Sequence, residues 1–100
     1  MYQVYILQSI KFNRFYIGQT ECLSNRIDLH NNGKVKSTFP YRPWRIIGTI
    51  SKGTRSESVI LERKLKNLNR EDLIKFIKKY FPDENLASLK SNANTNNTIK

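Results

Sequence analysis

Side chains capable of acid-base and phosphate chemistry recur through the first two thirds of the sequence, in segments otherwise suited to burying apolar surface. They are Tyr5, Tyr16, Arg26, His30 and Glu62. A phenol or an imidazole can move a proton, a guanidinium can donate two parallel hydrogen bonds to a phosphate, and a carboxylate can bind a hard divalent cation. If the fold brings these groups together, they meet the main needs of phosphodiester hydrolysis: a positioned water, a proton acceptor and positive charge against the phosphoryl oxygens.

The order and spacing of these residues also resemble a known family. Gln3-Val4-Tyr5-Ile6-Leu7 is followed by Phe15-Tyr16-Ile17-Gly18-Gln19, then by Arg26, by His30 four residues later and by a distant Glu62. This pattern resembles the GIY-YIG nucleases over roughly residues 2 to 81, in particular small single-domain members such as those of the UPF0213 type. The resemblance implies a metal-dependent endonuclease acting on DNA, with one divalent ion, Mg²⁺ or Mn²⁺.

Two positions depart from the family pattern. Val4 stands where the first motif has glycine, although the tyrosine that follows is retained. Gln19 occupies a position where some relatives carry lysine, so no role of that lysine can be transferred. Asn67 and Asn69 are candidates for a later asparagine that some relatives use, but neither match is firm.

The resemblance implies that Tyr5 and Tyr16 surround the attacking water. By their own chemistry, Arg26 can bind the phosphate through two parallel hydrogen bonds and Glu62 can bind the metal ion. Because a free phenol has a pKa of about 10, a tyrosine base needs help from its surroundings. We assign the base role to the tyrosine pair, with a preference for Tyr5 assisted by His30 and with Tyr16 orienting water and phosphate. Glu62 is preferred to Glu57 only because it matches the family's helix glutamate.

Each assignment has an ordinary structural alternative. Tyr5 and Tyr16 could be strand aromatics, Arg26 and His30 could flank an apolar helix stripe and reach water, and Glu62 could pair with Lys66 at i, i+4. For the whole protein, the alternatives are a catalytically weak or inactive nucleic-acid-binding module and a structural protein of the ribosome or nucleoid. A protein that only binds phosphate has no need for a carboxylate there, because the carboxylate would repel the ligand unless a cation intervened.

Composition narrows the class of protein. One hundred residues with 38% hydrophobic content suit a single domain, since so short a chain cannot bury two cores. Lysine and arginine total 18 against 8 acids, giving a net charge of +10, which predicts an anionic partner and most commonly nucleic acid. The candidate phosphate contacts are Arg14, Lys34, Lys36, Arg42, Arg45 and Arg55.

Cysteine usage and hydropathy indicate the cellular compartment in which the protein is expected. Cys22 is the only cysteine, which excludes an intramolecular disulfide and a cysteine-based zinc site and favours the reducing cytoplasm. No apolar run approaches the roughly 20 residues that cross a bilayer, and the N-terminus lacks the features of a secretory signal. We therefore expect a cytoplasmic protein with no membrane partner, and no obligate protein partner is evident.

The N-terminal segments predict an antiparallel hairpin. Residues 2–7 and 15–19 are rich in β-branched and aromatic side chains and flank a polar stretch. Alternation places Tyr5, Tyr16 and Gly18 on one face. The apolar face receives Tyr2, Val4, Ile6, Phe15 and Ile17. Because Gly18 has no side chain, we expect it to let a bulky ligand approach the backbone.

A helix is predicted over residues 20–32, with Thr20 as its N-cap and Gly33 as its stop. The i, i+3, i+4, i+7 spacing on one stripe is followed by Leu23, Arg26, Ile27 and His30. Residues 33–43 read as an exposed connection whose basic and hydroxyl groups, Thr38 included, could meet phosphates. A third strand over residues 44–50 is expected to place Trp44, Ile46, Gly48 and Ile50 on one side.

Two more helices complete the predicted domain. Thr54 and Glu57 have capping-box spacing at the start of a helix that runs to about Leu68, and Asn69 caps another that ends at Tyr80 before Pro82. The sequence thus predicts an α+β fold with a three-stranded antiparallel sheet, formed by the hairpin and a third strand, flanked by about three helices. We place a nuclease-like domain at residues 1–84 and a disordered polar tail at residues 85–100.

Overall fold

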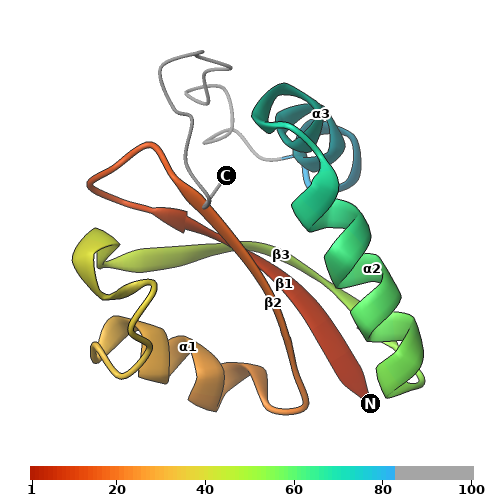
Figure 1. The fold of residues 1–100 in the computed structure, drawn as a ribbon, viewed down its shortest axis with the longest axis horizontal. Coiled ribbons are helices and arrows are strands. Elements are labelled where there is room, and N and C mark those ends of the chain that lie inside the picture. Colours follow the sequence, from red (N-terminus) through yellow and green to blue (C-terminus); the bar gives the residue numbers. More distant parts are fainter. Residues whose placement is uncertain (83–100) are drawn as a thin grey trace.

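The computed structural model describes residues 1–82, which form one antiparallel sheet with helices on both of its faces (Figure 1). The elements in chain order are β1 (Tyr2–Ser9), β2 (Phe15–Thr20), α1 (Leu23–Asn31), the 3₁₀ helix η1 (Phe39–Tyr41), β3 (Trp44–Lys52), α2 (Arg55–Asn67) and α3 (Arg70–Tyr80). The strand order is β2-β1-β3, so β1 is central and β2 is an edge strand. The predicted α+β architecture is confirmed.

The apolar face of the hairpin forms the larger core. Ile6 lies opposite Ile17 and Gln8 opposite Phe15, so the side chains sort as the alternation predicts. Val4, Ile6, Phe15 and Ile17 pack with residues of α2 and α3, namely Leu65, Leu73, Ile74 and Ile77. Fully burying each such side chain contributes about 1.5–3 kcal/mol, which is what holds α2 and α3 against this face.

The opposite face of the sheet is covered by α1 and η1. Tyr5, Leu7 and Trp44 are buried there, with Tyr16, Leu23, Ile27 and Tyr41 packed around them. Tyr5 lies opposite Gly18 in the register of β1 and β2. A Cβ at Gly18 would stand 2.6 Å from Cζ of Tyr5. The expectation of bare backbone open to a ligand is therefore wrong, because the Tyr5 ring already fills the space above Gly18.

The third strand departs from simple alternation. Ile6 pairs with Gly48 but Leu7 pairs with Ile46, so the register shifts and Ile47 is an extra residue in β3. Such a bulge turns the residues beyond it to the other face. Ile46 lies opposite Leu7 on the α1 face, whereas Gly48 lies opposite Ile6 on the other. The predicted common side for Trp44, Ile46, Gly48 and Ile50 is therefore wrong from Gly48 onward.

Helix α1 begins later than the sequence predicts. Thr20 pairs with Gln3 as the last residue of β2, and its hydroxyl accepts a hydrogen bond from the amide of Cys22 at 3.1 Å. The prediction of Thr20 as N-cap is wrong because that hydroxyl closes the turn instead. The end of the helix is as predicted. Gly33 has φ +78°, and its amide donates to the carbonyl of His30 at 3.3 Å.

Both predicted caps of the C-terminal helices are confirmed. The Thr54 hydroxyl accepts from the amide of Glu57 at 3.2 Å, and the Asn69 side chain accepts from the amide of Asp72 at 2.8 Å. Caps of this type stabilise a helix by about 1 kcal/mol each. The role of Asn69 is thereby explained as structural.

No helix within residues 1–82 is long and apolar enough to cross a membrane. The predicted polar tail, residues 85–100, lies outside the described part of the chain.

Candidate active site

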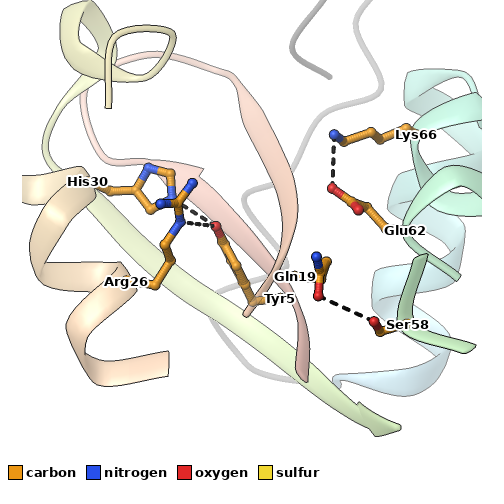
Figure 2. A network of polar contacts seen from close by, with 7 residues as sticks. All are labelled: Tyr5, Gln19, Arg26, His30, Ser58, Glu62 and Lys66. Carbon is orange, nitrogen blue, oxygen red and sulfur yellow. Dashed lines mark hydrogen bonds and ion pairs between the residues drawn. The ribbon is translucent and has the colours of Figure 1, made fainter. Parts of the chain in front are cut away.

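The centre of the site is the buried phenol of Tyr5. Its Oη lies 2.9 Å from Nε2 of His30 and 3.3 Å from Nε of Arg26, which donates to it. Tyr5 and His30 are both fully buried, each with 0% exposure. The alternative in which His30 reaches water is therefore wrong. Because Arg26 and His30 are four residues apart on α1, they meet Tyr5 from one side of that helix (Figure 2).

Hydrogen bonds beyond His30 indicate the direction of the proton network. The Thr38 hydroxyl donates to the carbonyl of Val35 at 3.2 Å, and Nδ1 of His30 lies 2.8 Å from the same hydroxyl oxygen. A hydroxyl has one proton to donate, so we assign Thr38 as the acceptor from His30, which places the imidazole proton on Nδ1. Nε2 of His30 is left to accept the proton of Tyr5. The phenol thus accepts from Arg26 and donates to His30.

Burial shifts the pKa values of both groups toward their neutral forms. Loss of solvent raises the pKa of the Tyr5 phenol to about 12, with the hydrogen bond from Arg26 acting in the opposite direction. Burial, together with the positive charge of Arg26, lowers the pKa of His30 to about 4. The pair is therefore neutral across the physiological pH range, with its proton on the phenol.

The low pKa of His30 makes the stability of the domain pH-dependent. As the pH falls, the unfolded state is protonated first, near pH 6.5, so stability is fully present above that value and is lost as the pH approaches 4. Between pH 7 and pH 4.5 we expect wild type to lose about 2–3 kcal/mol more than His30→Gln, as measured by urea unfolding. His30 is the only histidine, so no other imidazole contributes. Equal pH dependence in the two proteins would contradict the buried neutral imidazole.

Tyr16 lies beside the same cluster. Its ring centroid is 4.9 Å from that of His30 and 6.3 Å from that of Tyr5. Tyr16 is only half-buried, and it adds to the raised pKa of the Arg26 guanidinium after the larger effect of the hydrogen bond with Tyr5. Of the two motif tyrosines, Tyr16 is therefore the one with access to solvent.

Glu62 approaches from the other face of the sheet. It lies on α2, where its Oε2 is 3.0 Å from Nζ of Lys66, so the i, i+4 pairing considered as an alternative does form (Figure 2). The Glu62 charge is near enough to add to the elevation of the Tyr5 pKa, although burial is the main cause. The ammonium of Lys66 is in turn 6.0 Å from the Tyr16 ring. The edge strand β2 thus lies between the cluster of Tyr5, Arg26 and His30 on one face and the Glu62–Lys66 pair on the other.

Two further residues, Thr38 and Ser58, support these groups, although the sequence does not mark them for this role. Thr38, predicted to be exposed and to contact phosphate, is fully buried against His30, which corrects that expectation. Ser58 is buried on α2 and donates to the Gln19 side chain at 3.3 Å, which ties β2 to α2 one turn before Glu62. The sequence signal for the role of Ser58 is its position four residues before Glu62. Nothing local in the sequence signals the contact of Thr38.

The basic residues predicted to contact phosphates fall into two groups. Lys34, Lys36 and Arg55 are exposed. The other three are half-buried with protein partners: Arg14 stacks on Tyr41, Arg42 stacks on Phe39, and Arg45 donates to Gln8. Because these contacts hold Arg14, Arg42 and Arg45 in place, binding a phosphate with them costs less conformational entropy.

The residues present fit a magnesium-type ion held by a single protein ligand. Within residues 1–82 there is no group of three His, Cys, Asp or Glu side chains that could hold a metal. A zinc site needs such a group, whereas Mg²⁺ keeps several waters and binds through one or two carboxylates plus substrate phosphate. Glu62 can be that carboxylate once Lys66, whose side chain is 49% exposed, moves aside.

The fold and the arrangement of the site define a known class. The sequence profile of the GIY-YIG catalytic domain matches residues 1–87, and the chain therefore belongs to the GIY-YIG family, a family of nucleases.

Among solved structures, the fold is similar to the solution NMR structure of the UPF0213 protein BH0048 from Bacillus halodurans, with a TM-score of 0.58. The two chains are 26% identical, over 91% of this chain and 98% of that one. Comparison with curated proteins finds no match.

Proposed function

We propose that this protein is an endonuclease that hydrolyses phosphodiester bonds in DNA, with one Mg²⁺ or Mn²⁺ ion bound at Glu62. The observation that carries the proposal is the network in which Arg26 donates to the Tyr5 phenol and the phenol is hydrogen-bonded to the buried His30. A merely structural tyrosine does not need a guanidinium and a buried imidazole on its hydroxyl. Membership of a nuclease family supports the same conclusion.

In this proposal Arg26 holds the scissile phosphate. Its Nε is bound to Tyr5, which leaves the terminal nitrogens to face an incoming phosphate beside the phenol. A guanidinium donates two parallel hydrogen bonds to phosphate oxygens, and these strengthen as charge develops in the transition state. Tyr16, half-buried at the same position, orients the water and the phosphate.

Tyr5 and His30 act together as the proton acceptor. As the water attacks phosphorus and the P–O bond to the leaving oxygen breaks, the proton of the water passes to Oη of Tyr5 and the phenolic proton passes to Nε2 of His30, so no free phenolate is formed. The leaving oxygen departs as an alkoxide and takes a proton from solvent. The pKa values of about 12 and about 4 both oppose this transfer in the substrate-free protein. The negative phosphate favours it, because an anion near His30 raises the pKa of the imidazole.

A metal ion at Glu62 would supply positive charge to the phosphoryl oxygens and lower the pKa of its bound water. The Glu62–Lys66 ion pair is also what favours the alternative function, a binding module without turnover, because Lys66 already neutralises the carboxylate. In the endonuclease a divalent ion replaces the Lys66 ammonium at Glu62, whereas in the binding module the ammonium stays in place.

Cleavage of supercoiled plasmid by the purified protein tests the proposal. We expect nicking with Mg²⁺ or Mn²⁺, none with chelator, and a loss of at least about 100-fold in Arg26→Ala. Arg63→Ala, on the exposed surface of α2, is the matched control and should cleave like wild type. DNA binding without cutting of plasmid, branched or single-stranded DNA would contradict the endonuclease and favour the binding module. Metal-independent cutting would contradict the role of a divalent ion at Glu62.

A further inference from the structure

An exposed aromatic surface lies where the turn between β1 and β2 meets η1, at one end of the molecule (Figure 1). Phe12, in the turn, is 47% exposed. Its ring meets Tyr41 edge to face, with centroids 5.7 Å apart, and the guanidinium of Arg14 lies 4.1 Å from the centroid of the same Tyr41 ring. We call Phe12, Arg14 and Tyr41 the turn platform.

The turn platform is held rigidly although it faces solvent. The Ser9 hydroxyl donates to the carbonyl of Tyr41 at 2.6 Å and accepts from the amide of Phe12 at 3.0 Å. The amide of Ile10 donates to the carbonyl of Pro43 at 2.9 Å. These bonds fix the turn against the segment that follows η1. A large apolar ring held in place and left in water is better suited to bind a ligand than to cover a core.

The charge around the platform selects the kind of ligand. No Asp or Glu occurs in residues 1–20 or 29–56, the segments that contain the platform, whereas lysines and arginines are frequent there. The charge of these two segments is therefore of one sign and complementary to a polyanion. Helix α3, whose Arg70 donates to Asn13 of the same turn, adds that arginine and the neighbouring acids Glu71 and Asp72. A second copy of this chain would bring the same positive charge toward it, which disfavours self-association. An aromatic ring beside a guanidinium in a positive surface is the combination that stacks unpaired nucleobases.

A continuous row of rings joins the platform to the site. Tyr41 is 6.5 Å from Trp44, and Trp44 is 6.3 Å from Tyr16, measured between ring centroids. Trp44 is itself buried, and its indole donates to the carbonyl of Thr38 at 3.0 Å. Tyr41 of the platform and Tyr16 thus pack on the same face of the sheet, with the Trp44 ring between them. A strand only a few nucleotides long can reach both.

We propose that the turn platform stacks an unpaired nucleobase on Phe12 a few nucleotides from the bond that is cut, so that the preferred substrate has unpaired bases next to the scissile phosphate. This rests on the proposed function for the position of the cut, but the binding of unpaired bases does not depend on it. Arg14 contacts the adjoining backbone phosphate while remaining stacked on Tyr41.

Binding measurements in chelator test the platform without any cleavage. The probes are mixed-sequence fluorescein-labelled oligonucleotides of about 15 residues: a single strand, a blunt duplex, and a duplex with an unpaired tail. In Phe12→Ala we expect about 5- to 100-fold weaker binding of the single strand and the tailed duplex, with less than about a twofold change for the blunt duplex. Phe12→Trp should retain the preference.

Ile60→Ala is the matched control, because Ile60 is 66% exposed but lies on α2. It should bind all three probes like wild type. A base analogue whose fluorescence is quenched by stacking should be quenched by wild type and not by Phe12→Ala. Each of three results would overturn the proposal. They are unchanged binding in Phe12→Ala, an equal loss of binding for all three probes, and a wild-type dimer that Phe12→Ala converts to monomer. If wild type shows the preference but never cuts, the endonuclease fails and the platform stands.

Discussion

Glu62→Gln is expected to lower metal-dependent cleavage by at least about 100-fold while leaving the fold intact. The amide keeps the shape of the side chain but removes the negative charge that binds a hard cation. The substitution also breaks the ion pair with Lys66, which stabilises the folded protein by at most about 1 kcal/mol at this partly exposed position. Plasmid nicking over a range of Mn²⁺ concentrations measures the effect, and urea unfolding confirms the fold.

Two control variants separate metal binding from the ion pair. Glu57→Gln changes an exposed carboxylate near the start of the same helix and keeps an oxygen for the Thr54 hydroxyl, so it should cleave like wild type. Lys66→Met breaks the same ion pair without touching the carboxylate and should keep its cleavage at saturating metal. Full activity in Glu62→Gln, or equal losses in Glu62→Gln and Lys66→Met, would count against a metal at Glu62.

Gly18→Ala is expected to damage both the stability and the activity of the protein. The added methyl would lie 2.6 Å from Cζ of Tyr5, and the ring cannot move away because it is fully buried and bonded to His30 and Arg26. Overpacking of this kind costs about 1–3 kcal/mol. Displacing the phenol by about 1 Å should lower cleavage about 100-fold among the molecules that remain folded.

Other glycines of the chain provide the controls. A Cβ at Gly53 would meet only Oε1 of Glu57 at 3.7 Å, so Gly53→Ala should change neither property. A Cβ at Gly48 would stand 2.5 Å from the Phe81 ring, on the face away from Tyr5, so Gly48→Ala should destabilise the domain with little effect on cleavage per folded molecule. Thermal unfolding and nicking rates, corrected for the folded fraction, distinguish the three variants. Normal cleavage by Gly18→Ala would show that the position of Tyr5 is not critical.

The elements are predictable where local physics decides them. Alternation in the hairpin, the caps at Thr54 and Asn69 and the stop at Gly33 each depend on residues within a few positions of one another. The stripe that places Arg26 and His30 on one side of α1 follows in the same way from helical geometry. These short-range rules are sufficient for the fold class and for placing Arg26 and His30 together, whereas the choice of Glu62 rests on the resemblance to a family.

The rest depends on contacts between distant segments. The bulge at Ile47 leaves no trace in the sequence, because its neighbour Ile46 is equally apolar and either could face a core. The prediction for Thr20 is wrong because its hydroxyl has two possible uses, and pairing with β1 decides between them. The contact of Thr38 with His30 exists only because the segment leading into η1 folds back over α1. The assignment of the imidazole tautomer depends on that contact, so the proton direction at the centre of the site is not accessible to sequence reasoning.

Assembly of the candidate site around β2 has a consequence for how a polymer would enter. In the described part of the chain, β2 has a hydrogen-bonded neighbour only on its β1 side, and the two groups of side chains reach it from opposite faces. An open sheet edge of this kind is accessible to a ligand from the side. A closed circle of DNA can therefore be laid across it at any point along its contour, with no terminus to be threaded, which is the geometric requirement for cutting in the interior of a long molecule.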